Sequence, residues 1–160
     1  MAILNPQEAF FTQFEPIQKN RFQVTIPGIE PFLVAAITIP TPTSNVIVVD
    51  HINIQQKFLG KTTMPNFTIS IYNAIAPSSL QSIYEWFRLG HESYGRNGYK
   101  DVYSKILTVD ILSPVLETVS RFTIHGCFIS GISGLDFDKS ADGLVNITIT
   151  CECDYCELEF

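Results

Sequence analysis

The stretch LVNITITCECDY, residues 144–155, alternates apolar and polar residues more regularly than any other part of this chain. Successive side chains of a β-strand point to opposite faces, so the alternation predicts a strand with one buried face. The buried face would carry Val145, Ile147, Ile149, Cys151, Cys153 and Tyr155. The opposite face would carry Asn146, Thr148, Thr150, Glu152, Asp154 and, just beyond the stretch, Cys156.

Further strands are expected upstream. Residues 21–26 and 66–73 show the same period of two, whereas residues 32–39 are almost continuously apolar and predict a fully buried strand that ends at a Pro-Thr-Pro breaker. Residues 46–58 predict a long hairpin that bends near Asp50 and His51. The two remaining strands are expected at residues 104–112 and 118–130.

One helix interrupts this series of strands. Leu80, Ile83, Tyr84, Phe87 and Leu89 are spaced to form one apolar face of a helix. Ser78 is a suitable N-terminal cap and Gly90 a suitable end. The Gly-rich residues 90–100 predict a loop, and residues 130–134 predict a turn between two strands.

These elements predict a mainly β fold, α+β by a strict count, in which antiparallel sheets pack as a sandwich or barrel with one amphipathic helix. We expect an N-terminal arm at residues 1–18 and a single β domain at residues 19–160. The arm shows no period, but Phe10, Phe11, Phe14 and Ile17 are too apolar to remain in water. We therefore expect the arm to dock on its own domain or on a neighbour.

Composition excludes several classes of protein. Apolar residues make up 46% of the chain and charged residues 16%, which excludes a disordered protein. So few charges indicate either a large core or a surface covered by neighbouring subunits. The net charge of −6 disfavours a protein that grips nucleic acid, because it repels phosphate. The sequence shows no signal peptide and no apolar run of membrane-spanning length, so we expect a soluble protein without a membrane anchor, made in a cytosol.

The cysteines form the one pattern typical of a metal or redox site. Cys151, Cys153 and Cys156 follow a C-x-C-x-x-C spacing, with Cys127 further upstream. In a continuous strand Cys156 points away from the other two, so three sulfurs could not converge on one ion. We therefore expect reduced packing residues and no metal. A disulfide between subunits through Cys156 is a separate hypothesis, because this residue lies close to the C-terminus.

No constellation typical of catalysis is present. His51, His91 and His125 are scattered, and the sequence contains neither a nucleophile elbow nor a phosphate-binding glycine loop. The acidic residues 136–142 lack the terminal glutamate of a calcium loop. We therefore expect no enzyme, no catalytic residue and no cofactor.

Several segments, in order, resemble the tail tube proteins of contractile-tailed phages, the family typified by the T4 tube. Residues 135–138 (LDFD), and residues 146–149 (NITI) running into 154–157 (DYCE), resemble that family's Leu-Asp-aromatic-Asp loop and closing strand. Cys156 stands where the family pattern has an aromatic residue. Residues 22–26, and residues 68–73 followed by a helix around Trp86, resemble its first strand and its strand–helix unit.

The resemblance implies a virion protein, assembled in the host cytoplasm, that forms stacked hexameric rings and one continuous β-barrel tube. Implied partners are the sheath, the tape-measure protein in the lumen, and the baseplate and tail-terminator proteins, with DNA only in transit. The polar residues expected to face the lumen are Gln23, Thr25, Thr148, Thr150, Glu152 and Asp154. The hairpin residues expected to join stacked rings are Val46, Ile47, Val49, Ile52, Ile54 and Phe58.

Two groups of alternatives stay open at this point. A baseplate tube initiator, a tube-end protein and the tube of a contractile injection system would share the fold and differ in copy number. A monomeric β-sandwich module that binds carbohydrate or protein would instead expose an aromatic patch, for which Tyr94 and Tyr99 are the candidates.

Overall fold

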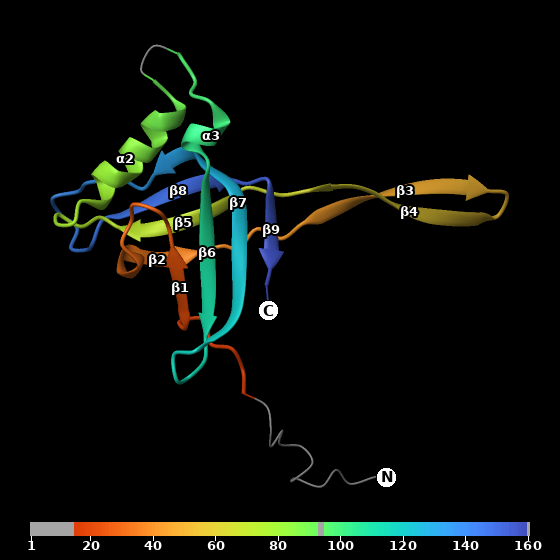
Figure 1. The fold of residues 1–160 in the computed structure, drawn as a ribbon, viewed down its shortest axis with the longest axis horizontal. Helices are drawn as coiled ribbons and strands as arrows, with labels where there is room; N and C mark the ends of the chain where they lie inside the picture. The colour runs from red at the N-terminus through yellow and green to blue at the C-terminus, as the bar shows by residue number, and fades with distance from the viewer. Residues whose placement is uncertain (1–14, 93–94, 160) are drawn as a thin grey trace, which may run out of the picture.

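The computed structural model describes residues 15–92 and 95–159, as a folded body from which one hairpin projects (Figure 1). Residues 1–14 of the expected arm lie outside the described residues, and residues 15–18 form no helix or strand. In chain order the elements are β1 (Phe22–Thr25), the 3-10 turn η1 (Pro31–Leu33), β2 (Val34–Ile37), β3 (Thr43–His51), β4 (Ile54–Thr63), β5 (Phe67–Tyr72), α2 (Ser79–Gly90), α3 (Lys100–Tyr103), β6 (Lys105–Leu112), β7 (Thr118–Ser133), β8 (Asn146–Glu152) and β9 (Tyr155–Leu158).

The body is built from a seven-stranded antiparallel sheet in the order β1-β6-β7-β8-β5-β2, with β9 also paired to β7. Strand β7 takes part in two halves of this sheet, because residues 118–127 pair with β6 and residues 128–133 pair with β8. We call β1, β6, β9 and the first part of β7 the β6 half. We call β2, β5, β8 and the second part of β7 the β8 half. The expected mainly antiparallel β fold is confirmed.

The core is made by the inner faces of the two halves. In β5 and β8 every second residue is buried, which places Ile69, Ile71, Ile147 and Ile149 inside, as the alternation predicts. The β6 half contributes the remaining layer of aliphatic side chains: Val24, Leu107, Val109 and Ile124. Burial of these aliphatic side chains supplies most of the favourable free energy of folding.

The C-terminal strand differs from the sequence prediction. It divides at Cys153 and Asp154, yet the register against β7 is unchanged: Phe128 lies opposite Glu152 and His125 lies opposite Tyr155. At the break, Gly126 of β7 has a φ of +66°, and a Cβ there would lie 2.2 Å from Asp154 Oδ2. The bend reorients the strand beyond it. Tyr155 is therefore exposed instead of buried.

Two further predictions are wrong in detail. The predicted buried strand at residues 32–39 is a 3-10 turn followed by β2, and Phe32 is 69% exposed. Phe32 lies in η1, before β2 begins, so the alternation of a strand does not place it against the core; β2 itself pairs with β5 alone among the described strands. Residues 130–133 do not form the predicted turn but continue β7, since Gly131 and Ser133 pair with Thr150 and Thr148.

Helix α2 begins and ends as predicted. Ser78 caps it by accepting a hydrogen bond from the backbone nitrogen of Gln81 at 3.4 Å. Its buried side chains include Ile83 and Trp86, whereas Leu89 of the predicted apolar face is exposed. The single predicted helix is joined by a second, short one, α3, at the end of the predicted loop 90–100.

The indole of Trp86 connects the two helices by donating a hydrogen bond to the carbonyl oxygen of Tyr103 at 2.8 Å. No helix in residues 15–92 or 95–159 combines the length and apolar character needed to span a membrane.

Candidate assembly surfaces

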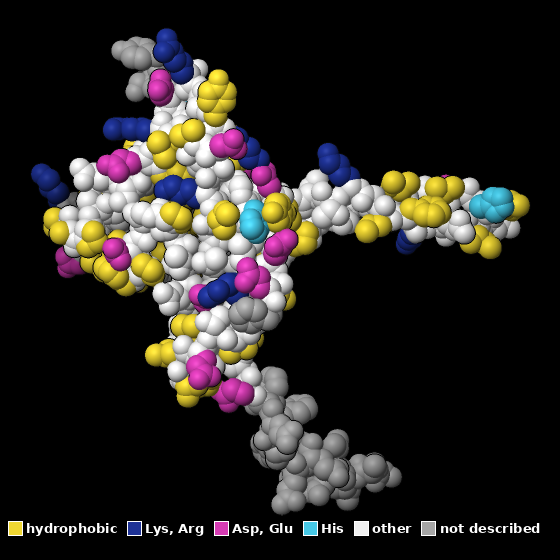
Figure 2. Space-filling view, viewed as in Figure 1, with side chains coloured by type: hydrophobic (Ala, Val, Ile, Leu, Met, Phe, Trp, Pro, Cys, Tyr) yellow, Lys and Arg dark blue, Asp and Glu magenta, His cyan; other side chains and the backbone are white. Residues whose placement is uncertain are grey.

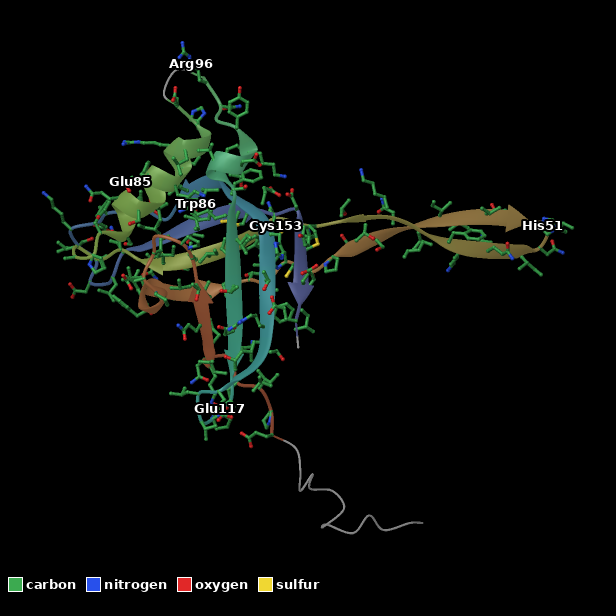
Figure 3. All side chains as sticks on the ribbon, viewed as in Figure 1. His51, Glu85, Trp86, Arg96, Glu117 and Cys153 are labelled. Carbon is green, nitrogen blue, oxygen red and sulfur yellow. The ribbon has the colours of Figure 1, made fainter. Side chains whose placement is uncertain are left out.

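The hairpin β3-β4 is the most conspicuous surface feature of the molecule. It extends away from the body, with His51 close to its tip (Figures 1 and 3), and all residues of the two strands except Gly60 are exposed. The predicted hairpin is confirmed, and its bend lies at Ile52 and Asn53, one residue beyond His51. An isolated two-stranded ribbon is marginally stable in water, and an exposed apolar patch of this kind is typical of an interaction surface.

The strand register divides the hairpin side chains between two faces. Ile47 lies opposite Phe58, Val49 opposite Gln56 and His51 opposite Ile54. Residues directly opposite each other share a face. One face, which we call the apolar hairpin face, therefore carries four of the residues predicted to join stacked rings: Ile47, Val49, Ile54 and Phe58.

The other two predicted residues lie elsewhere on the hairpin. Val46 is on the opposite face with Leu59, near Lys57. Ile52 is at the tip, where it is 91% exposed and has a φ of +54°. A β-branched residue rarely adopts a left-handed backbone, so the turn holds Ile52 in an unfavourable conformation. Figure 2 shows hydrophobic side chains along the length of the hairpin.

Sequence reasoning missed Leu59, which is 78% exposed and lies beside Val46 on the face opposite to the apolar hairpin face. The prediction ended the hairpin at Phe58, but β4 continues to Thr63. In the structure, polar pairs hold the two strands together at the base of the hairpin. Ser44 Oγ and Thr62 Oγ1 share a hydrogen bond of 2.8 Å there.

The outer face of the β8 half is polar and mostly uncharged. Thr148 and Thr150 lie opposite Ser70 and Thr68 of β5, and opposite Ser133 and Gly131 of β7. Two serine hydroxyls donate to the strand backbone: Ser133 to the carbonyl oxygen of Thr148 at 3.3 Å, and Ser130 to that of Thr150 at 3.1 Å. Glu152, also predicted to face the lumen, lies at the end of β8.

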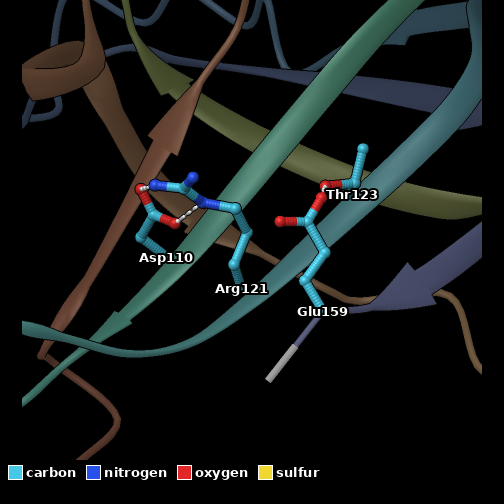
Figure 4. Close-up of polar contacts among 4 residues, drawn as sticks. All are labelled: Asp110, Arg121, Thr123 and Glu159. Atoms are coloured by element: carbon cyan, nitrogen blue, oxygen red, sulfur yellow. Dashed lines mark hydrogen bonds and ion pairs between the residues drawn. The ribbon is translucent and has the colours of Figure 1, made fainter.

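The outer face of the β6 half carries charges instead. Gln23 and Thr25, also predicted to face the lumen, lie opposite Asp110 and Thr108 there. Arg121 Nε donates to Asp110 Oδ1 at 2.6 Å and Arg121 Nη2 to Asp110 Oδ2 at 3.2 Å (Figure 4). On the same face Thr123 Oγ1 donates to Glu159 Oε1 at 2.5 Å (Figure 4). The two groups of predicted lumen residues therefore belong to different halves.

Asp154, the last predicted lumen residue, is engaged at the strand break. Lys100 Nζ donates to Asp154 Oδ1 at 2.7 Å, which ties the start of α3 to the C-terminal strand. The hydrogen bond to this carboxylate raises the pKa of Lys100. The pair is largely exposed, so it positions the two segments more than it stabilises them.

The four cysteines lie on the core side of the molecule. Cys127 and Cys151 are buried, and a thiol hydrogen bond between them raises the pKa of Cys127. Burial raises the pKa of Cys153 to about 11. Within the described residues no group of three or more His, Cys, Asp or Glu side chains is arranged to hold a metal ion.

Cys156 does not lie on the polar face where the continuous strand would place it. After the break it pairs opposite Ile124 and packs half-buried against the core. This burial raises the pKa of Cys156 above that of a free thiol. A disulfide between Cys156 and a neighbouring subunit would therefore form only if this part of β9 opens.

No family model matches the chain, and no curated protein matches it in sequence. The fold, however, is shared with solved structures over almost its whole length. A chain in the anti-feeding prophage tube-terminating cap is similar with a TM-score of 0.75 and 18% identity, over 98% of this chain and 99% of that one. The fold is one found in contractile injection tube assemblies.

Two structures of the extracellular contractile injection system PVC contain chains with the same fold. A chain of its sheath–tube complex is similar with a TM-score of 0.73 and 16% identity, over 92% of this chain and 93% of that one. A chain of its sheath/tube terminator has a TM-score of 0.75 and 16% identity, over 93% of this chain and 100% of that one. At these identities the likeness concerns the fold and assigns no role to individual residues.

Proposed function

We propose that this chain is a non-catalytic structural subunit of the tube in a phage-like contractile injection system, which assembles into stacked hexameric rings. The observation that carries the proposal is the apolar hairpin, exposed along its whole length on a fold shared with such assemblies. A soluble monomer would not keep this surface in water. The sequence resemblance pointed to a phage tail tube, and the similar structures move the proposal toward the injection-system tube.

The ring would close through the two free edges of the β8 half. Strand β2 pairs with β5 alone, and residues 128–133 of β7 pair with β8 alone, among the described residues. The four strands alternate in direction, so β2 and the second part of β7 run antiparallel. An edge of one subunit can therefore pair antiparallel with the opposite edge of the next. Such a contact between two different surfaces closes into a ring by rotation and removes the edges.

The outer face of the β8 half would line the lumen of this ring. Its serine and threonine hydroxyls offer little charge to bind a passing polyanion, so DNA or another cargo could slide. The charged face around Arg121 and Asp110, with Gln23 and Thr25, would then face outward, toward a sheath.

The apolar hairpin face would join one ring to the next. Each strand of the hairpin has 9 or 10 residues, which corresponds to a reach of about 30 Å. This reach exceeds what packing within one subunit requires and suits contact with a second ring.

The test is negative-stain microscopy of the purified protein, together with its mass by light scattering. We expect rings or hollow tubes. A monodisperse monomer at high concentration, with native circular dichroism, would overturn the proposal.

A second candidate is a subunit that ends the tube. It is favoured by the similarity to chains in the tube-terminating cap and in the sheath/tube terminator. Copy number separates the two roles: a tube subunit is present in many rings of each particle, and a terminal or initiating subunit in one or two. Quantitative mass spectrometry of isolated particles measures this ratio.

A further inference from the structure

An open apolar groove of about 530 Å³ runs along the seam between the two ends of the sheet. One wall is formed by Ala35 and Ile37 of β2 and by Ile39 just after it, and the other wall is formed by β1 and β6. Phe22, Val109 and Ile111 lie on that second wall. The groove therefore opens directly toward the hydrophobic core of the sandwich.

Backbone pairing does not close this seam within the described part of the chain. Strand β1 pairs only with β6, and β2 pairs only with β5, although they stand at the two ends of the strand order. Water in an apolar groove of this size is unfavourable, so an apolar segment that fills it stabilises the protein. The chemistry of the groove thus specifies an occupant with large apolar side chains.

The chain provides such a segment at the mouth of the groove. Fourteen residues precede the first described residue, Glu15, and the chain that follows it already lines the groove through Ile17 and Lys19. Residues 10–14 read FFTQF and carry three phenylalanines. Phe14 is three residues from Ile17, a reach of about 10 Å, and Phe10 is within about 24 Å.

We propose that Phe10, Phe11 and Phe14 of the same chain dock in this groove and seal the seam between β1 and β2. A covalently attached segment has an effective concentration in the millimolar range, which favours it over a segment from a second copy. Its charge also fits. Residues 1–14 contain Glu8 and no Lys or Arg, whereas Lys19 at the mouth forms no ion pair with any described residue.

The other available occupant is the hairpin of a second copy. Its apolar face carries a single aromatic residue, Phe58, and the hairpin also carries Lys57 and Lys61, which would approach Lys19 and Arg21 at the groove. The arm fits the groove better in both size and charge. Docking is proposed for the side chains that line the groove, and it leaves the backbone groups at the free edge of β2 to the pairing between subunits proposed above.

The test places a photo-crosslinking benzoylphenylalanine in the groove as Ile37→Bpa, with Thr38→Bpa at the exposed rim as a second position that does not disturb packing. After irradiation, mass spectrometry identifies the attached peptide. We expect peptides from residues 1–14. A mixture of heavy-isotope and unlabelled protein shows whether both partners come from one chain. Attachment to residues 43–63, attachment to the arm of a second copy, or no attachment at either position would overturn the proposal.

A matched pair of variants tests the role of the aromatic residues. The triple change Phe10→Ser, Phe11→Ser and Phe14→Ser should lower crosslink yield by about tenfold or more, since each buried aromatic side chain shifts the docking equilibrium by at least that factor. The control Ile3→Ser with Leu4→Ser removes apolar side chains from the same arm and should leave the yield unchanged. Equal yields in the two variants would contradict the assignment.

Discussion

Replacing Ile47 and Val49 by aspartate should abolish stacking of rings without unfolding the subunit. Both side chains lie on the apolar hairpin face with Ile54 and Phe58, and 54% of Ile47 and 47% of Val49 remain exposed in the isolated subunit. Full burial of a Val, Ile or Phe side chain contributes about 1.5–3 kcal/mol, so burying the exposed half contributes about 1 kcal/mol each. The four side chains together then contribute about 4 kcal/mol to each contact between hairpin and neighbour.

Losing two of these four side chains removes about 2 kcal/mol per contact, a factor of about 30 in the association constant. The buried carboxylates add a desolvation cost, so the critical concentration for tube assembly should rise by at least that factor. Sedimentation of tubes across a concentration series measures it, and negative-stain images show whether single rings persist. Thermal unfolding should stay unchanged, because the replaced side chains do not contact the core.

The opposite face of the same strand provides a matched control. Val46→Asp with Val48→Asp introduces the same two charges and removes similar apolar surface, on the face that also carries Lys57 and Leu59. We expect this variant to assemble at a critical concentration closer to that of the native protein. If Ile47→Asp with Val49→Asp assembles normally, or if both pairs impair assembly equally, the reasoning that one face makes the contact is refuted.

Three further predictions concern the body of the molecule. Gly126→Ala should lower the free energy of unfolding by at least about 1–2 kcal/mol, because the φ of +66° is unfavourable for a residue with a side chain and the new Cβ would clash with Asp154. The control Gly143→Ala, which has no neighbour within 4 Å, should have little effect, and urea unfolding of both variants measures the difference. Burial holds the pKa of Cys153 at about 11, against 9.0 for a free thiol, so the stability that the protonated thiol contributes is intact below pH 9 and is lost as the pH rises to about 11. The alkylation rate of Cys153 in the native protein should therefore keep rising past pH 9, and a plateau at pH 9 would contradict the burial. The disulfide hypothesis predicts that oxidised particles show a crosslinked ladder on non-reducing gels that disappears in Cys156→Ser, and oxidised particles of the native sequence without a ladder would exclude it.

The class of fold and the location of the hairpin follow from the order of the amino acids alone. A period of two is a property of the strand alone, because successive side chains alternate between faces whatever the strand packs against. For this reason the burial of Ile147 and Ile149 and the positions of the central strands are predicted correctly. The helix α2 is predicted correctly from its own local signals, the spacing of its apolar residues and the cap at Ser78. The exposed apolar hairpin was also visible as a stretch longer than a domain needs.

Tertiary structure decided which strands are neighbours and where each face points. Periodicity does not report that residues 31–33 form a 3-10 turn before β2 begins, so Phe32 is predicted to be buried and is exposed. It does not report the bend at Gly126 and Asp154, which moves Cys156 from the polar face to the core. Polar alternation makes Thr25 and Thr150 candidates for the lumen alike, and only the fold separates them onto the two halves of the sheet. Alternation fixes the two sides of each strand, and only the pairing of distant strands fixes which side meets the core, the solvent or another subunit.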